Sequence, residues 1–481
     1  EEYGAELLKK VRGMFAFVIW NTQTNELFGA RDHFGIKPLY YTEMNGSFIY
    51  GSEIKSFLQH PEFKKELNKE ALRPFMTFQY SALDETFFKN VYRIKEGHYF
   101  TYKNGVLEIK QYWDVKDNEK NMSLAETVDL IDKSVQESID IHKNADVEVG
   151  SFLSSGVDSS YVATVLRPNK TYSIGFGDKT FNESVEAKAL TDMIGLKNES
   201  RVIEGEESFM NFPLIQYHLD EPDSNPSCVP LFFLSELASR DVRVVMSGEG
   251  ADELFGGYQT YGFYTKSKLI RQTTALLKKL PKKARYSLAS FIKDKEFPGS
   301  LHMYSNLAPA EESFIGNAKV FEEKEALEYL TSEYSKSPSV SDIVNKQYKK
   351  VRGLSELKKK KYLDFHQWMP KDILLKADKL SMAHSLELRV PLLDIELMKV
   401  SEQVPEKYMI NSKNTKYAFR QAAGRHLPEE WSNREKLGFP VPIKDWLREE
   451  RYYQHVRELF SKEWVKEFFN QDKIIQLLDE N

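Results

Sequence analysis

Residues 154–160 have the composition of a loop that holds phosphate groups. They read Ser-Ser-Gly-Val-Asp-Ser-Ser and lie between a short apolar run and a stretch with helical spacing. Small residues let backbone N–H groups approach an anion, and the start of a helix adds a favourable dipole. The segment lacks the Gly-Lys-Ser/Thr of a Walker A loop and the glycine spacing of a dinucleotide fingerprint. A plain helix N-cap is the alternative interpretation of such a serine-rich turn.

The carboxylate of Asp158 favours the phosphate interpretation because it implies a cation. A carboxylate repels a phosphate unless a positive charge lies between them. Mg²⁺ is a hard ion that prefers carboxylate, water and phosphate oxygens. The sequence therefore predicts a magnesium ion at Asp158.

A second segment of the same kind occupies residues 247–258 and reads SGEGADELFGGY. It also comes directly after a predicted buried strand, so its small residues could line the same site. Asp252 is then a second candidate ligand for Mg²⁺, and Glu249 is a candidate proton acceptor. The alternative is an ordinary acidic helix start, since Asp and Glu favour the first helical turn.

The segments around these loops alternate between strand-like and helix-like patterns. We expect strands at residues 147–153, 172–176 and 242–246, and helices at 124–141, 161–166 and 185–194. Such alternation predicts a parallel, doubly wound sheet, which binds ligands beyond the carboxyl ends of its strands near a switch point. We therefore expect the two loops to face one another. From about Tyr261 onward, helical patterns dominate.

The first ~110 residues have a different pattern, which predicts antiparallel strands. Turn signals at residues 21–25, 44–46 and 104–105 separate short strand-like runs, and Asn-Gly at the last two is a strong hairpin signal. This part is expected to form a layered domain. The polar stretch at residues 114–121 is interpreted as a linker.

Composition narrows the function classes. The net charge of −5 argues against a nucleic-acid partner held by phosphate contacts. The lysine-rich run at residues 350–361 is interpreted as a solvated helical face, because Leu354 and Leu357 interrupt it at near-helical spacing. The single cysteine, Cys228, cannot form an internal disulfide, which favours a reducing compartment, the cytoplasm. No apolar run is long enough to span a bilayer, so no membrane partner is expected.

Longer motifs resemble a known enzyme family. Residues 154–159 are similar to the SGGxDS pyrophosphate loop of N-type ATP pyrophosphatases, with Ser155 in place of a glycine. Residues 247–258 resemble the glutamine-hydrolysing (class B) asparagine synthetases. So do LLKADKLSMAHSLELRVPLLD at 374–394 and NREKLGFPVP at 433–442. RDHFGIKPLYY at 31–41 is similar to the late part of that family's glutaminase domain. The resemblance covers nearly the whole chain.

The resemblance implies an α/β fold with two domains. Residues 1–115 would be a partial class II glutamine amidotransferase domain, an Ntn-hydrolase-type β-sandwich of antiparallel sheets. Residues 122–481 would be the synthetase domain, with a doubly wound ATP pyrophosphatase sheet and a helical C-terminal part. A homodimer is one arrangement that the resemblance leaves open.

The resemblance also implies a role for each matching residue. Ser154, Gly156, Asp158 and Ser159 would cradle the pyrophosphate of ATP, and Asp158 and Asp252 would hold Mg²⁺. The nucleotide would also contact Phe152, Ile174, Ser247 and Gly248. Glu249 matches an acid needed to form or use an aspartyl-adenylate, and Lys436 matches a lysine that stabilises charge at the reacting centre.

The implied reaction is the ATP-dependent conversion of aspartate to asparagine through β-aspartyl-AMP, giving AMP and pyrophosphate. The small-molecule partners would be aspartate, ATP and either ammonia or glutamine. Two alternatives stay open, because the motifs do not define the acceptor pocket. One is a related amide-forming enzyme, such as a β-lactam synthetase or an antibiotic-pathway amidotransferase. The other is a non-catalytic ATP-binding fragment.

One departure from the family concerns glutamine. The family's glutaminase begins with a catalytic cysteine, whereas this sequence begins with Glu1. The family's glutamine-binding residues lie upstream of the segment matching residues 13–17, and Cys228 is expected to be packed rather than nucleophilic. The end at residues 477–481 also stops short of the family's final segment. We therefore expect ammonia-dependent activity from this chain.

Overall fold

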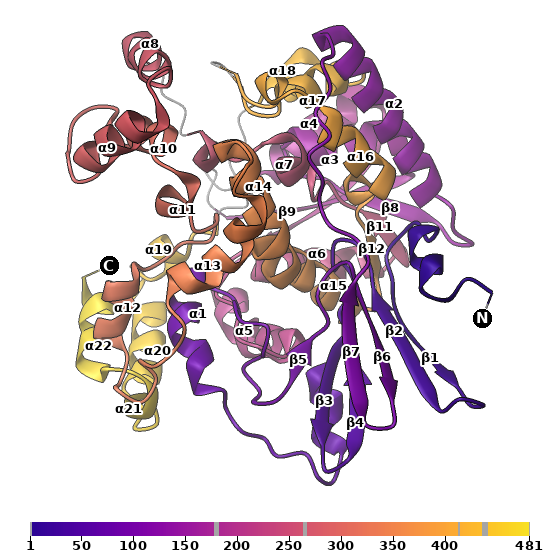
Figure 1. Ribbon diagram of the computed structural model, residues 1–481, viewed down its shortest axis with the longest axis vertical. Coiled ribbons are helices and arrows are strands. Elements are labelled where there is room, and N and C mark those ends of the chain that lie inside the picture. Colours follow the sequence, from indigo (N-terminus) through magenta and orange to yellow (C-terminus); the bar gives the residue numbers. More distant parts are fainter. Residues whose placement is uncertain (1, 178–181, 263–266, 412–413, 435–440, 481) are drawn as a thin grey trace.

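The computed structural model describes residues 2–177, 182–262, 267–411, 414–434 and 441–480. Two antiparallel sheets come first, a five-stranded parallel sheet follows, and helices make up most of the remainder (Figure 1). This order confirms the predicted fold class. None of the helices in the described parts is long and apolar enough to cross a membrane.

The N-terminal part consists of two antiparallel sheets. The first sheet has the strand order β1 (Ala16–Asn21), β2 (Glu26–Arg31), β6 (His98–Lys103), β7 (Val106–Gln111). The second has the order β4 (Ser47–Gly51), β3 (Tyr40–Met44), β5 (Tyr92–Arg93). All three predicted hairpins are present, and Asn45 and Gly46 both have the positive φ that a tight type I′ turn requires. The sheets share a small core, in which the rings of Phe48 and Tyr102 stack with centroids 4.4 Å apart.

The parallel sheet has the strand order expected of a doubly wound fold. It runs β10 (Lys197–Ile203), β9 (Lys170–Phe176), β8 (Val149–Phe152), β11 (Val244–Met246), β12 (Glu387–Arg389). The chain therefore starts in the centre at β8, adds strands on one side, and then crosses to the other side at β11. Strands β8 and β11 are direct neighbours in parallel register, with Met246 opposite Ser151. The switch point lies between them.

Helices connect the strands and form the C-terminal part. The connecting helices are α2 (Leu124–His142), α3 (Val157–Leu166), α4 (Ser184–Ile194), α5 (Gly205–Leu219), α6 (Cys228–Ser239) and α7 (Ala251–Phe255). The later helices are α8 (Lys268–Leu277), α9 (Lys282–Ile292), α10 (Ser300–Leu307), α11 (Ala310–Ser313), α12 (Glu323–Tyr329), α13 (Val340–Tyr348), α14 (Glu356–His366), α15 (Leu374–Met382), α16 (Ile395–Gln403), α17 (Tyr417–Ala423), α18 (Glu429–Asn433), α19 (Ile443–Trp446), α20 (Glu450–Phe460), α21 (Val465–Phe468) and α22 (Gln471–Asp479). Helix α1 (Leu72–Phe78) belongs to the N-terminal part.

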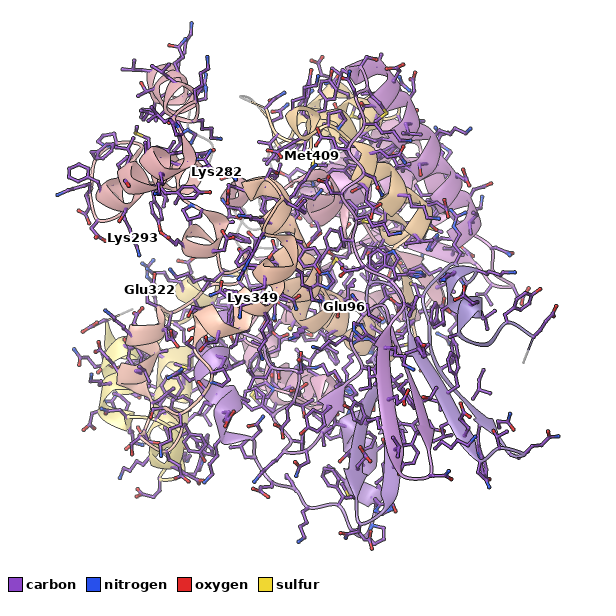
Figure 2. The ribbon with its side chains drawn as sticks, in the orientation of Figure 1. Glu96, Lys282, Lys293, Glu322, Lys349 and Met409 are labelled. Atoms are coloured by element: carbon purple, nitrogen blue, oxygen red, sulfur yellow. The ribbon has the colours of Figure 1, made fainter. Side chains whose placement is uncertain are left out.

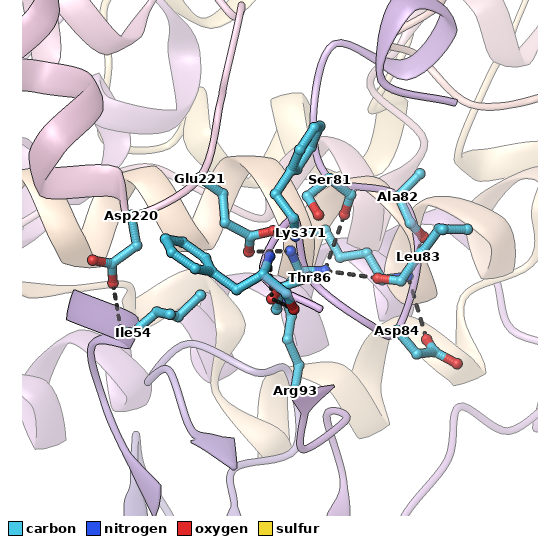
Figure 3. Close-up of polar contacts among 12 residues, drawn as sticks. Ile54, Ser81, Ala82, Leu83, Asp84, Thr86, Arg93, Asp220, Glu221 and Lys371 are labelled. Atoms are coloured by element: carbon cyan, nitrogen blue, oxygen red, sulfur yellow. Dashed lines mark hydrogen bonds and ion pairs between the residues drawn. The ribbon is translucent and has the colours of Figure 1, made fainter. Parts of the chain in front are cut away.

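Buried polar contacts join the antiparallel sheets to the rest of the molecule (Figure 3). The Arg93 guanidinium pairs with Glu221 and also donates to the carbonyl of Leu83 at 2.8 Å. Lys371 donates to the carbonyl of Ala82 at 2.6 Å. Arg93 and Glu221 are both buried. Because an unpaired buried charge is costly, each side chain stabilises the other by compensating its charge.

The polar stretch at residues 114–121 has no helix or strand, as a linker would. It is nevertheless attached along its length. The Asp114 carboxylate accepts hydrogen bonds from Tyr362 at 2.9 Å and His366 at 3.0 Å, and the Lys116 N–H donates to Glu402 at 2.8 Å. The other ring nitrogen of His366 lies 2.5 Å from Glu96, which precedes β6.

The interpretation of residues 350–361 as a solvated face is wrong for the lysines at its end. Lys359, Lys360 and Lys361 are buried in α14, and each has its own acceptors. Lys359 pairs with Glu311 at 2.9 Å, whereas Lys361 donates to the carbonyl of Leu254 at 2.6 Å. Burial lowers the pKa of Lys360 to about 8 and that of Lys361 to about 7. The helical spacing of this run predicted a helix, but it did not predict that the helix would be buried by the rest of the protein.

Candidate active site

A cavity of about 540 Å³ lies beyond the carboxyl ends of β8 and β11, at the switch point of the sheet. It is lined by ten of the eleven residues to which the sequence assigned a role. These are Phe152, Ser154, Gly156, Asp158, Ser159, Ile174, Ser247, Gly248, Glu249 and Asp252. The eleventh, Lys436, lies outside the described residues. The structure thus brings the two predicted loops together around one space.

Hydrogen bonds to its own serines fix the conformation of the first loop. The Gly156 N–H donates to Ser154 Oγ at 3.1 Å, and the Ser154 N–H donates to Ser159 Oγ at the same distance. The two hydroxyl oxygens are 2.9 Å apart. Gly156 caps α3, so the first N–H groups of that helix point toward the cavity end of the loop. Hydroxyl and backbone donors at a helix start suit a phosphate group.

The second loop approaches the first so closely that a side chain would not fit between them. A Cβ atom on Gly248 would lie 2.5 Å from the backbone nitrogen of Ser159. Likewise, a Cβ atom on Gly257 would overlap the Asp252 carboxylate, at 1.7 Å from its Oδ1 atom. The glycines therefore let the backbone of one loop contact the backbone of the other and leave room for Asp252.

Lys416 connects the two candidate metal ligands. Its ammonium lies 2.6 Å from Asp158 Oδ2 and 2.7 Å from Asp252 Oδ1, and its side chain is 1% exposed. Lys416 immediately precedes α17 and has a positive φ of 52°. The two carboxylates thus converge on one position that is suited to a positive charge.

The carboxylates of Asp158 and Asp252 also fit the predicted magnesium ion. Both are hard oxygen donors within reach of a common point, and nucleotide phosphates and water normally complete such a coordination shell. Among the described residues, three or more metal-ligating side chains do not gather anywhere in the structure. An ion here would therefore depend on the nucleotide for the remainder of its ligands.

Another part of the cavity lining belongs to a polar network around Asp372. This buried carboxylate accepts hydrogen bonds from Trp368 at 2.6 Å, Lys376 at 2.7 Å and Asn225 at 2.9 Å. The three donors line the cavity. Asp372 lies in a π-helical turn, Met369–Ile373, that joins α14 to α15. Such turns widen a helix and are frequent at functional sites.

Cys228 lies behind this network, where it begins α6. It is buried and unpaired with another cysteine, as the sequence predicted. Burial, together with the neighbouring Asp223 carboxylate, raises the pKa of its thiol well above the usual value. A thiol in that state is a packing residue rather than a nucleophile.

Comparison with known proteins identifies the family. Residues 130–481 match the asparagine synthase family, and residues 1–113 match a glutamine amidotransferase domain. The chain belongs to the asparagine synthase family. It is 37% identical to asparagine synthetase (glutamine-hydrolyzing) 1 of Bacillus subtilis, over 484 residues that cover 100% of this chain and 75% of that protein.

Other relatives in the family are more distant. A putative asparagine synthetase (glutamine-hydrolyzing) of Mycobacterium tuberculosis is 35% identical over 465 residues, which cover 93% of this chain and 69% of that protein. Asparagine synthetase (glutamine-hydrolyzing) 3 of Bacillus subtilis is 25% identical over 478 residues, which cover 93% of this chain and 71% of that protein. The family assignment therefore rests on similarity along almost the whole chain and not on the two loops alone.

Several residues in or beside the cavity carried no signal in the sequence. Lys416 stands in the segment NTKYAFR, and a lone lysine is normally a solvated surface residue. Asn225, Trp368 and Lys376 line the cavity, but none of them has a local pattern that marks a binding site. Only the fold shows that these three side chains reach the same space and that Lys416 lies beside it.

Proposed function

We propose that this member of the asparagine synthase family activates aspartate with ATP and converts it to asparagine. The observation that carries the proposal is the meeting of the two Gly/Ser loops, with Asp158 and Asp252, at the switch point of the sheet. The 37% identity to an asparagine synthetase over the whole chain supports the same reaction.

In the first step, a carboxylate oxygen of aspartate attacks the α-phosphorus of ATP, and the bond to pyrophosphate breaks. The products are β-aspartyl-AMP and pyrophosphate. Ser154, Gly156 and Ser159 would hold the leaving pyrophosphate through hydroxyl and backbone N–H donors. Fixed donors aimed at developing charge are usually the largest contribution to catalysis.

Mg²⁺ held by Asp158 and Asp252 would supply further neutralisation of the phosphate charge. Lys416 lies between these carboxylates and would keep them from repelling one another whenever the ion is absent. Lys436 keeps its predicted role of stabilising charge at the reacting centre as part of this proposal.

In the second step, ammonia attacks the acyl carbon and AMP leaves. The nitrogen then loses a proton, for which Glu249 is the proposed acceptor because it lines the cavity beside Ser247 and Gly248. Positioned general bases contribute about 10²–10⁴ in rate.

The test is an assay of this 481-residue chain with ATP, Mg²⁺ and aspartate, to which either ammonium or glutamine is added. We expect AMP, pyrophosphate and asparagine in equal amounts with ammonium. Ammonium tests the synthetase site directly, whereas glutamine tests whether the chain can also release ammonia. A folded sample that binds ATP but forms no AMP with aspartate would contradict the proposal, and a panel of other carboxylates would follow.

A further inference from the structure

Helices α8 and α9 extend from the body of the molecule as a helical arm, which we define as residues 267–299 (Figure 1). The arm packs against α10 through a small core of its own, formed by Ala289, Ile292, Leu307 and Ala308. This core is separate from the large core around the parallel sheet. The arm thus has little to do with the cavity and needs another explanation.

The arm concentrates positive charge. It contains nine lysines and arginines and two acidic residues, so its net charge is 9 − 2 = +7. The whole chain has a net charge of −5, so the remainder carries −5 − 7 = −12. Lys282 and Lys283, at the start of α9, are both exposed, and Figure 2 labels Lys282 and Lys293 on the arm.

The same arm exposes large apolar side chains. Leu269 is 74% exposed and Leu276 is 66% exposed. They are seven positions apart, which is about two turns, so they share one face of α8. Phe291 on α9 is 69% exposed. A helix with exposed leucines beside lysines has the composition of an element that lies in the interface of a membrane.

We propose that the helical arm docks the enzyme on the surface of an anionic lipid bilayer. Lysines attract acidic headgroups, and the exposed leucines and phenylalanine enter the boundary between headgroups and acyl chains. Such surface attachment needs no spanning segment. It therefore agrees with the finding that no described helix could cross a membrane, but it contradicts the expectation from the sequence that the protein has no membrane partner.

The composition of the arm favours lipid over the other anionic or apolar partners. Nucleic-acid surfaces often rely on arginine for bidentate contacts to bases, whereas seven of the nine cationic residues here are lysines. Pairing of the arms of two copies would bring two charges of +7 together. A bilayer satisfies both the charge and the apolar side chains at once.

Flotation with lipid vesicles tests the proposal on the full chain. We expect the protein to bind vesicles that contain equal amounts of phosphatidylglycerol and phosphatidylcholine, and not to bind vesicles of pure phosphatidylcholine. It should dissociate from the anionic vesicles in 1 M salt, since ionic screening weakens surface attraction. Each lysine near an anionic surface strengthens binding about fivefold, so Lys282→Gln with Lys283→Gln should weaken it about 25-fold. Leu269→Ser with Leu276→Ser should also weaken it at least tenfold.

Matched variants elsewhere on the chain provide the controls. Lys64→Gln with Lys65→Gln removes the same charge from exposed positions in the N-terminal part, and Val185→Ser removes an apolar side chain that is 64% exposed. Both controls should bind like the unchanged protein, and circular dichroism should show every variant folded. The proposal is overturned if anionic vesicles are not bound, or if the controls lose as much binding as the arm variants. Two other results overturn it: preference for duplex DNA over vesicles, or a dimer that the arm variants dissociate.

Discussion

The ammonium of Lys416 lies 2.6 Å from Asp158, although 258 positions separate the two residues in the chain. The same ammonium is 2.7 Å from Asp252. One buried cation therefore joins the first turn of α3 to the first turn of α7, and with them the two loops of the cavity. The catalytic chemistry that we propose depends on this junction being preserved.

We expect Lys416→Met to destabilise the protein by about 3–5 kcal/mol, the typical cost of removing one partner from a buried ion pair. The two carboxylates would then face each other without a cation. Urea unfolding followed by circular dichroism measures the loss. Millimolar Mg²⁺ should restore part of it in the variant and change the parent little. Lys462→Met, which removes an exposed pair with Glu458, is the control and should cost less than about 1 kcal/mol.

Gly248→Ala should separate the loops and reduce pyrophosphate formation by about 100-fold, since a displacement of about 1 Å in a reacting geometry has that effect. The reason is the 2.5 Å approach of a Cβ atom to the Ser159 nitrogen. Gly353→Ala is the matched control, because its Cβ atom would meet nothing within 4 Å. Pyrophosphate release is the measurement. Equal rates for the two variants would show that the loops tolerate separation.

Glu249→Gln tests the proposed proton acceptor. The substitution keeps the size of the side chain, so ATP binding should be unchanged, whereas asparagine formation with ammonium should fall by about 10²–10⁴. Isothermal titration with ATP and Mg²⁺ measures the first property, and product analysis measures the second. An undiminished yield of asparagine would remove Glu249 from the mechanism.

The contacts of His366 predict a dependence of stability on pH. Burial by itself would lower the pKa of His366, but the hydrogen bonds to Asp114 and Glu96 and their negative charges outweigh it and raise the pKa. A raised pKa in the folded state gives stability that is complete below the unfolded pKa of about 6.5 and is lost as the pH rises through the folded value. The same contacts hold the pKa of Asp114 at about 2, so its contribution persists down to mildly acidic pH.

His366→Gln should therefore cost more stability at pH 6 than at pH 9. The difference between the two costs should be about 1.4 kcal/mol for each unit by which the pKa is raised. Urea unfolding of parent and variant at both pH values measures it. A cost that is equal at pH 6 and pH 9 would mean that folding does not shift the pKa of the imidazole.

The sequence predicted the parts of the site that depend on local order. Asp158 and Asp252 each stand a few residues after a short apolar strand, and the carboxyl ends of parallel strands meet at one edge of a sheet. Lys416 could not be found in this way, because its position depends on how the helical C-terminal part folds back over the sheet. Lys361 illustrates the same limit: helical periodicity predicts a helix, but not that the Leu254 carbonyl will accept a hydrogen bond from its ammonium.

The N-terminal part and the part that follows the linker hold each other through buried polar contacts. The backbone N–H of Ser224 donates to the carbonyl of Gln79 at 2.9 Å, and buried Glu221 depends on Arg93 for its compensating charge. A cut near residue 118 would leave Glu221 without that arginine and expose the surface beneath it. The synthetase half expressed alone should thus be recovered mainly in inclusion bodies, unlike the joined chain; soluble, monodisperse material would argue otherwise. The domain boundary that the sequence suggests therefore does not divide the protein into two parts that fold independently.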